Sequence, residues 1–107
     1  MNVRTYWARI YMSGPIKVAK QALREEALRD PVCFTIEPTT FVYEGGEESG
    51  FVVGLINYPR FPSQPHLIRG RALAVARHLL AATFQRSALV MTPETTTWLR
   101  IEDAEAS

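Results

Sequence analysis

The residue types that most often carry chemistry are few in this chain, and they do not converge in the sequence. The two histidines, His66 and His78, are twelve residues apart. On one helix this spacing separates them by about 18 Å, so they cannot chelate one metal ion without help. The only cysteine, Cys33, stands in a strand-like segment with no local catalytic partner. We therefore expect a core cysteine and solvated histidines, and no catalytic residue, metal site or cofactor.

A possible anion site lies at Ser13-Gly14-Pro15, where a strand is expected to end and a helix to begin. Free amides and the helix dipole attract anions at such a junction, so Ser13 and Gly14 are anion-binding candidates. A plain helix cap explains the same residues. The segment IYMSGP, residues 10–15, resembles the opening strand and loop of nucleoside deoxyribosyltransferases. That resemblance implies a larger parallel α/β fold and a downstream catalytic carboxylate.

Aromatic residues and an arginine share one side of the first expected strand. Trp7, Arg9 and Tyr11 alternate along it, and Phe51 begins a neighbouring strand. Such side chains stack on bases or hold a partner's side chains, so these four residues are a candidate binding face. Alternatively, the last strand or a second copy of the chain covers them.

The same strands resemble the RNA-recognition fold. The segment Ile10-Tyr11-Met12 stands in the place of its short aromatic motif, and Gly50-Phe51-Val52-Val53 in the place of its longer one. The resemblance implies binding of single-stranded nucleic acid on the free face of a sheet.

A proline-rich loop offers a third candidate. Tyr58, Arg60 and Phe61 lie among prolines in the segment YPRFP. A rigid loop that exposes such residues resembles a hot spot for binding a protein. Alternatively, Phe61 packs against the core and the prolines only set the path of the chain.

The periodicity of apolar residues predicts the elements that position these candidates. Their order is strand, helix, strand, strand, helix, strand, with a possible fifth strand at the end. This order is typical of an α+β, ferredoxin-like βαββαβ sandwich, with an antiparallel sheet and both helices on one face. Helices are expected near 15–29 and 65–84, and strands over 3–12, 32–43, 51–58, 87–91 and 95–101.

Several single residues test this arrangement. Pro38 lacks a ladder donor, which places it on an edge strand or at a bulge. Gly45 and Gly46 can take positive φ, so a hairpin is expected around them. Ser13 or Gly14 and, at the second helix, Ser63 are expected to cap the helix starts. The residues expected in the core are Ile10, Leu23, Ile68, Val75, Leu79 and Val90.

Length and composition are those of one globular domain. The chain has 107 residues, of which 47% are hydrophobic, and a net charge of +1. We expect a single domain over 1–101 and a flexible acidic tail over 102–107. Proteins that bind nucleic acid usually have an excess of lysine and arginine, and the net charge of this chain shows no such excess. No stretch is long and apolar enough to span a membrane. A single cysteine, which can form no internal disulfide, fits a reducing compartment, so we expect the protein in the bacterial cytoplasm.

Two longer segments carry a further resemblance. ARIYMSGP, residues 8–15, and GGEESGFVVGLINYPRFP, residues 45–62, are similar to segments of small bacteriophage and prophage proteins. The resemblance implies an accessory role and no particular chemistry. We therefore expect a non-enzymatic protein that binds a protein partner, forms a homodimer and does not bind membranes. The alternatives are single-stranded nucleic-acid binding and, third, a small nucleotide-related hydrolase or transferase.

Overall fold

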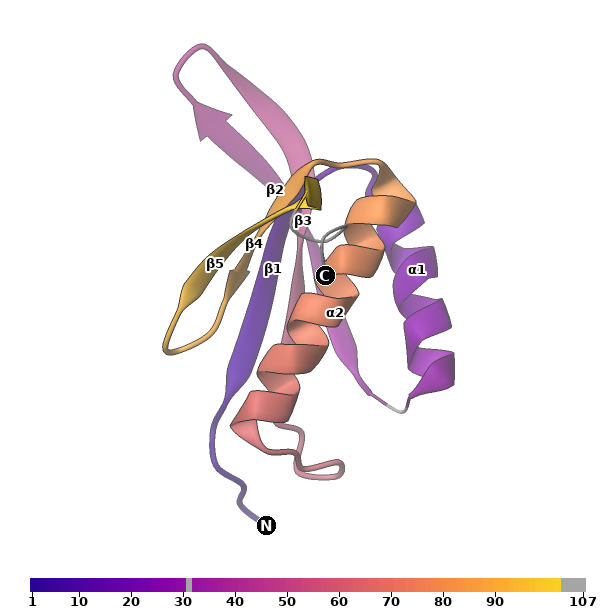
Figure 1. Ribbon diagram of the computed structural model, residues 1–107, viewed down its shortest axis with the longest axis vertical. Coiled ribbons are helices and arrows are strands. Elements are labelled where there is room, and N and C mark those ends of the chain that lie inside the picture. The colour runs from indigo at the N-terminus through magenta and orange to yellow at the C-terminus, as the bar shows by residue number, and fades with distance from the viewer. Residues whose placement is uncertain (31, 103–107) are drawn as a thin grey trace.

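A computed structural model describes residues 1–30 and 32–102. Five strands form one antiparallel sheet in the order β2-β3-β1-β4-β5, and two helices complete the fold (Figure 1). The predicted α+β class and order of elements are confirmed, and the fifth strand extends the sheet beside β4. The bounds are β1 Trp7–Ser13, α1 Ile16–Arg29, β2 Phe34–Tyr43, β3 Gly46–Ile56, α2 Pro65–Thr83, β4 Ser87–Met91 and β5 Thr96–Arg100.

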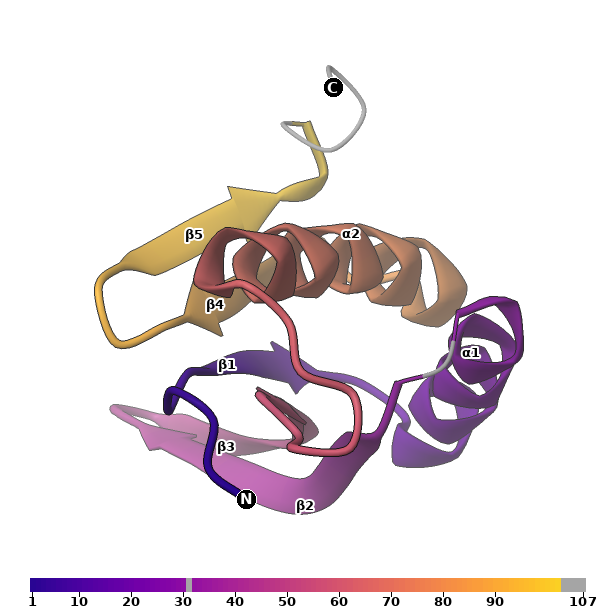
Figure 2. The ribbon, with the colours of Figure 1, turned by 90° about the horizontal axis from the view of Figure 1, so that it is seen from below.

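Both helices lie on the same side of the curved sheet (Figure 2). Alternation along the strands sets this arrangement, because successive side chains point to opposite faces. In β1, Ala8, Ile10 and Met12 are buried beneath the helices, whereas Arg9 is exposed on the other face. The core therefore occupies one side of the sheet. All six residues expected in it, from Ile10 to Val90, are buried.

The helix starts differ from the expectation. Pro15 and Gln64 are the N-cap residues of α1 and α2, and neither makes a side-chain cap hydrogen bond. The expected caps, Ser13 or Gly14 for α1 and Ser63 for α2, are therefore wrong. Ser13 still belongs to β1, and its hydroxyl donates to the carboxylate of Glu48 instead.

The β2–β3 hairpin is longer than the sequence indicated. Its turn is Glu44-Gly45, with Gly45 at φ 91°, so β3 begins at Gly46 rather than at residue 51. The last pairing of β3 with β1 joins Gly50 to Ser13, so the hairpin projects beyond the rest of the sheet (Figure 1). Pro38 lies on the edge strand β2, as predicted.

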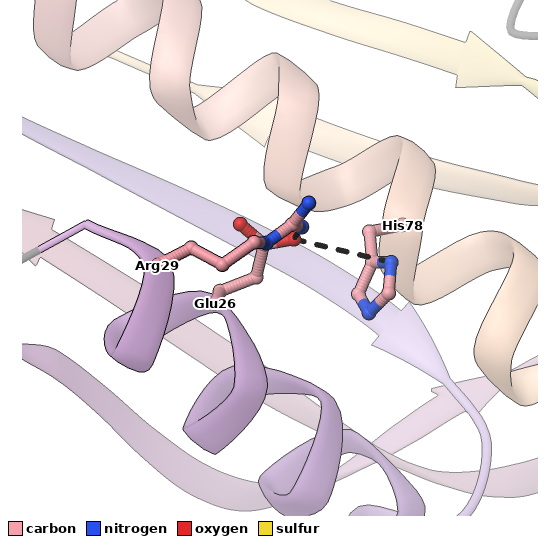
Figure 3. A network of polar contacts seen from close by, with 3 residues as sticks. All are labelled: Glu26, Arg29 and His78. Atoms are coloured by element: carbon pink, nitrogen blue, oxygen red, sulfur yellow. Dashed lines mark hydrogen bonds and ion pairs between the residues drawn. The ribbon is translucent and has the colours of Figure 1, made fainter.

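The two helices meet through a polar contact. The imidazole Nδ1 of His78 on α2 lies 3.9 Å from a carboxylate oxygen of Glu26 on α1, and Arg29 pairs with the same oxygen (Figure 3). His78 Nε2 is buried and has no hydrogen-bond partner among the described residues. His78 is thus part of the helix interface rather than a fully solvated histidine. His66 is exposed at the start of α2.

Cys33 is exposed and precedes β2, so its expected place in the core is wrong. The alternation of β2 explains this, because the strand's core-facing positions are Phe34 and Ile36. Within the described part of the chain, no helix is long and apolar enough to cross a membrane. Of the expected acidic tail, residues 103–107 lie outside the described residues.

Candidate functional site

The outer face of the sheet carries most of the first candidate. Arg9 is exposed there, and its guanidinium lies 4.9 Å from the ring centre of Trp7, within the range of a cation–π contact. Tyr11 follows on the same face between Val52 and Leu89 of the neighbouring strands. Neither helix covers these residues, and β5 lies beside β4 rather than over them (Figure 2).

Phe51 does not belong to this face, and its predicted place there is wrong. Its side chain is 0% exposed and packs in the core beneath the helices. The register pairs Phe51 with the core residue Met12, whereas Val52 pairs with Tyr11. The continuous apolar run of β3 conceals this alternation in the sequence.

The strand-to-helix junction is not arranged for an anion. The Ser13 hydroxyl bonds to the Glu48 carboxylate at 3.2 Å, which places a negative charge beside it. The Gly14 amide donates to the backbone oxygen of Ser49 at 3.3 Å. Both expected ligand groups are therefore already engaged, and one faces a group that repels anions.

The third candidate loop borders a cavity of about 250 Å³. The rings of Tyr58 and Phe61 lie 6.2 Å apart between centroids, at a tilt of 32°, and both line it. Arg60, which is not among the lining residues, places its guanidinium over the Phe61 ring, 5.7 Å from the ring centre. The remaining lining residues come from the segment before β2, the end of β3, the loop before α2 and the first turns of α2: Val32, Cys33, Leu55, Ile56, Pro62, Ser63, Ile68 and Arg71.

Asn57, directly after β3, holds this loop in place. Its amide nitrogen donates to the backbone oxygen of Arg4 at 2.7 Å, and its side-chain oxygen accepts from the Ser63 amide at 2.9 Å. The backbone of Phe61 also donates to Tyr58, which closes a tight turn. The loop is therefore fixed at both ends, and its aromatic rings are positioned before any ligand arrives.

A charged pair lies at one side of the cavity. Arg71 of α2 pairs with Asp30, the residue after α1. Arg71 and Ser63 also line an adjoining hollow, together with Asp30 and Glu26. The combined region joins an aromatic, apolar wall to a cation and two carboxylates.

This arrangement suits a ligand with two unlike ends. Flat aromatic or apolar groups fit against Tyr58 and Phe61, and a zwitterionic group matches a guanidinium beside a carboxylate. The cavity is slightly smaller than the roughly 300–1,000 Å³ of most small-molecule sites, so a nucleoside-sized ligand also needs the adjoining hollow. No group of three or more histidine, cysteine or acidic side chains is placed to hold a metal ion within residues 1–30 and 32–102.

Sequence reasoning found two of these residues, Tyr58 and Phe61, and missed Asp30, Asn57 and Arg71. Asp30 and Arg71 are 41 positions apart, and only the packing of α1 against α2 brings them together. The one local signal was an asparagine at the end of a strand, followed by a proline-rich turn.

Two solved structures have the same fold over nearly the whole chain. The chain is similar to a phage SAM lyase in complex with S-methyl-5'-thioadenosine, at 13% identity and a TM-score of 0.71, covering 95% of this chain and 94% of that one. It is also similar to a phage SAM lyase in the apo state, at 13% identity and a TM-score of 0.58, covering 89% and 88%. No protein-family model and no curated protein matches the chain.

These structures correct the functional expectation. At 13% identity the likeness shows the fold, and both of these structures are of a phage enzyme. The prediction of a non-enzymatic binding protein is contradicted by them. Their phage origin agrees in outline with the resemblance of residues 8–15 and 45–62 to phage and prophage proteins.

Proposed function

We propose that this protein is an enzyme that cleaves S-adenosylmethionine, or a closely related adenosyl sulfonium, and releases S-methyl-5'-thioadenosine. The observation that supports this proposal is the agreement in fold with the phage lyase over 95% of one chain and 94% of the other. The agreement is better with the structure that contains the thioadenosine than with the apo structure.

This cleavage needs little general acid or base catalysis from the protein. The bond between sulfur and the γ-carbon of the methionyl group breaks, and sulfur keeps the electron pair. The leaving group is then a neutral thioether, which needs no proton. A lyase adds no water, so the electron pair that completes the γ-carbon comes from the substrate itself: its carboxylate oxygen bonds to the γ-carbon as the bond to sulfur breaks. The four-carbon remainder leaves as a five-membered lactone, and no proton is gained or lost. The protein must chiefly bind the substrate in one conformation and exclude water.

The cavity beside the 58–61 loop is our candidate site for this ligand. The adenine would lie against Tyr58 and Phe61, whose faces also attract the positive sulfonium. The carboxylate of the methionyl group would pair with Arg71, and its ammonium group with Asp30. The existing pair of Arg71 and Asp30 would thus exchange partners with the substrate's two charges.

Isothermal titration calorimetry with S-adenosylmethionine and S-methyl-5'-thioadenosine tests this site. Only S-adenosylmethionine carries the charged amino-acid group. Phe61→Ala should weaken the binding of both S-adenosylmethionine and S-methyl-5'-thioadenosine, by roughly 5- to 150-fold if about 1–3 kcal/mol of stacking is lost. Arg71→Met should weaken the binding of S-adenosylmethionine and leave that of the thioadenosine unchanged.

Two matched variants serve as controls. Phe84→Ala removes an exposed phenylalanine at the end of α2, and Arg69→Met removes an arginine of α2 that does not line the cavity. Both should bind like the unmodified protein. Equal affinities for the thioadenosine in Phe61→Ala and Phe84→Ala would place the ligand elsewhere, without excluding the reaction.

A further inference from the structure

A second hollow lies at the end of the sheet opposite the projecting β2–β3 hairpin. The N-terminal segment, the start of α2 and the turn between β4 and β5 meet there (Figure 1). Its lining residues include Arg4, Tyr6, His66, Arg69 and Glu94. None of its lining residues belongs to the cavity beside the 58–61 loop, so this hollow is distinct from the proposed site of the adenosyl ligand.

Three basic side chains in this hollow have no acidic partner. Arg4, His66 and Arg69 take part in no ion pair within residues 1–30 and 32–102. Helix α2 supplies no partner either, because no acidic residue stands in its first turn or at three or four positions from Arg69. Basic groups that share a hollow repel one another when charged, so an anion between them lowers the electrostatic energy.

The carboxylate of Glu94 does not neutralise these groups. Its Oε1 accepts a hydrogen bond from the Tyr6 hydroxyl at 3.0 Å. The side chain of Tyr6 is buried, so the core fixes this partner. Two guanidiniums against one carboxylate leave the hollow with a net charge of +1, and protonation of His66 raises it to +2.

The walls of the hollow are held in place before any ligand arrives. On the N-terminal side, the side-chain amide of Asn57 donates to the backbone oxygen of Arg4 at 2.7 Å. At the β4–β5 turn, the Thr92 hydroxyl accepts from the backbone amides of Glu94 and Thr95, at 3.2 and 3.1 Å. The remaining wall is the regular helix α2. A site whose backbone is already fixed loses little conformational entropy when it binds a ligand.

We propose that this hollow binds a small phosphate-bearing anion, between Arg4 of the N-terminal segment and Arg69 of α2. Guanidinium groups donate paired hydrogen bonds to phosphate oxygens, and an imidazolium at His66 adds a further charged donor. A phosphate group carries a charge of roughly −1.5 to −2 at pH 7, which matches the positive charge of the hollow. The volume of the hollow, about 570 Å³, leaves room for the group to which the phosphate is attached.

Proton NMR of the two histidines tests the proposal within one molecule. His66 lines the hollow, His78 lies in the helix interface, and the chain has no other histidine. At about pH 6.5, in a buffer without phosphate, added pyrophosphate should move the Hε1 signal of His66 toward its protonated position, because a bound anion favours the imidazolium. The signal of His78 should stay in place. The spectrum of His66→Gln assigns the two signals.

Arginine variants identify the side chains that hold the anion. Arg4→Gln and Arg69→Gln should each weaken pyrophosphate binding by roughly five-fold, the upper end for one exposed ion pair. The double variant should weaken it by roughly 25-fold if the two side chains act independently. Arg24→Gln, the matched control, removes an exposed arginine of α1 outside the hollow and should bind like the unmodified protein. An unchanged His78 signal shows that each variant is folded.

Several results would overturn the proposal. One is a His66 signal that shows no saturable movement in millimolar pyrophosphate, or that moves equally in potassium chloride of the same ionic strength. Another is unchanged pyrophosphate binding in the double variant. His66 also borders the hollow that contains Arg71, so equal weakening by Arg71→Met and Arg69→Gln would place the anion there instead.

Discussion

At the scale of single residues, Asn57 fixes the loop beside the candidate cavity without lining the cavity itself. Its side chain joins two segments that are far apart in sequence, the N-terminal segment at Arg4 and the loop at Ser63. Its backbone amide donates to the oxygen of Tyr6 as well. Loss of the side chain leaves a carbonyl and an amide without these partners, and the loop can then open without disturbing the core.

Asn57→Ala should therefore increase the opening of the 58–61 loop. The loss of two net hydrogen bonds is worth about 1–2 kcal/mol, which raises the open population roughly 5- to 30-fold. Limited proteolysis by trypsin after Arg60 reports this population directly. Asn2→Ala, at an exposed residue near the N-terminus, is the control and should be cleaved at the original rate. Equal cleavage rates in the two variants would show that the loop is held by other contacts.

At the scale of the elements, two glycines show how closely the strands approach and how open the helix surface is. A Cβ atom at Gly50 would lie 2.2 Å from the backbone oxygen of Met12 and 2.6 Å from the ring of Phe41. Nothing lies within 4 Å of the same position at Gly70, in the exposed side of α2. The same substitution should therefore have opposite effects at the two sites.

Gly50→Ala should lower the free energy of unfolding by roughly 1–3 kcal/mol or more, because the backbones of β1 and β3 must separate. Gly70→Ala should raise it by about 0.5–1 kcal/mol, because alanine favours the helix. Urea unfolding followed by circular dichroism measures both. A Gly50→Ala variant as stable as the unmodified protein would contradict the described register between β1 and β3. A destabilised Gly70→Ala variant would contradict the open surroundings of Gly70.

At the scale of the whole molecule, the sequence was enough to predict the architecture. Helical spacing located α1 and α2 to within one residue, and Pro38 marked the edge strand correctly. The sequence could not predict on which face of the sheet Phe51 lies, because an uninterrupted apolar run lacks the alternation of apolar and polar residues that distinguishes the two faces. The sequence also could not predict the ion pair of Asp30 and Arg71, since this pair depends on how the two helices pack. A site made of such distant residues leaves no local motif.

The measurement that tests the central claim most directly is proton NMR of S-adenosylmethionine incubated with the protein. The S-methyl group gives separate signals in a sulfonium and in a thioether. We predict that the sulfonium signal falls and that the signal of S-methyl-5'-thioadenosine rises by the same amount, far faster than with heat-denatured protein. If the substrate decays at the same slow rate with native and denatured protein, the proposed lyase activity is wrong and only the fold is shared.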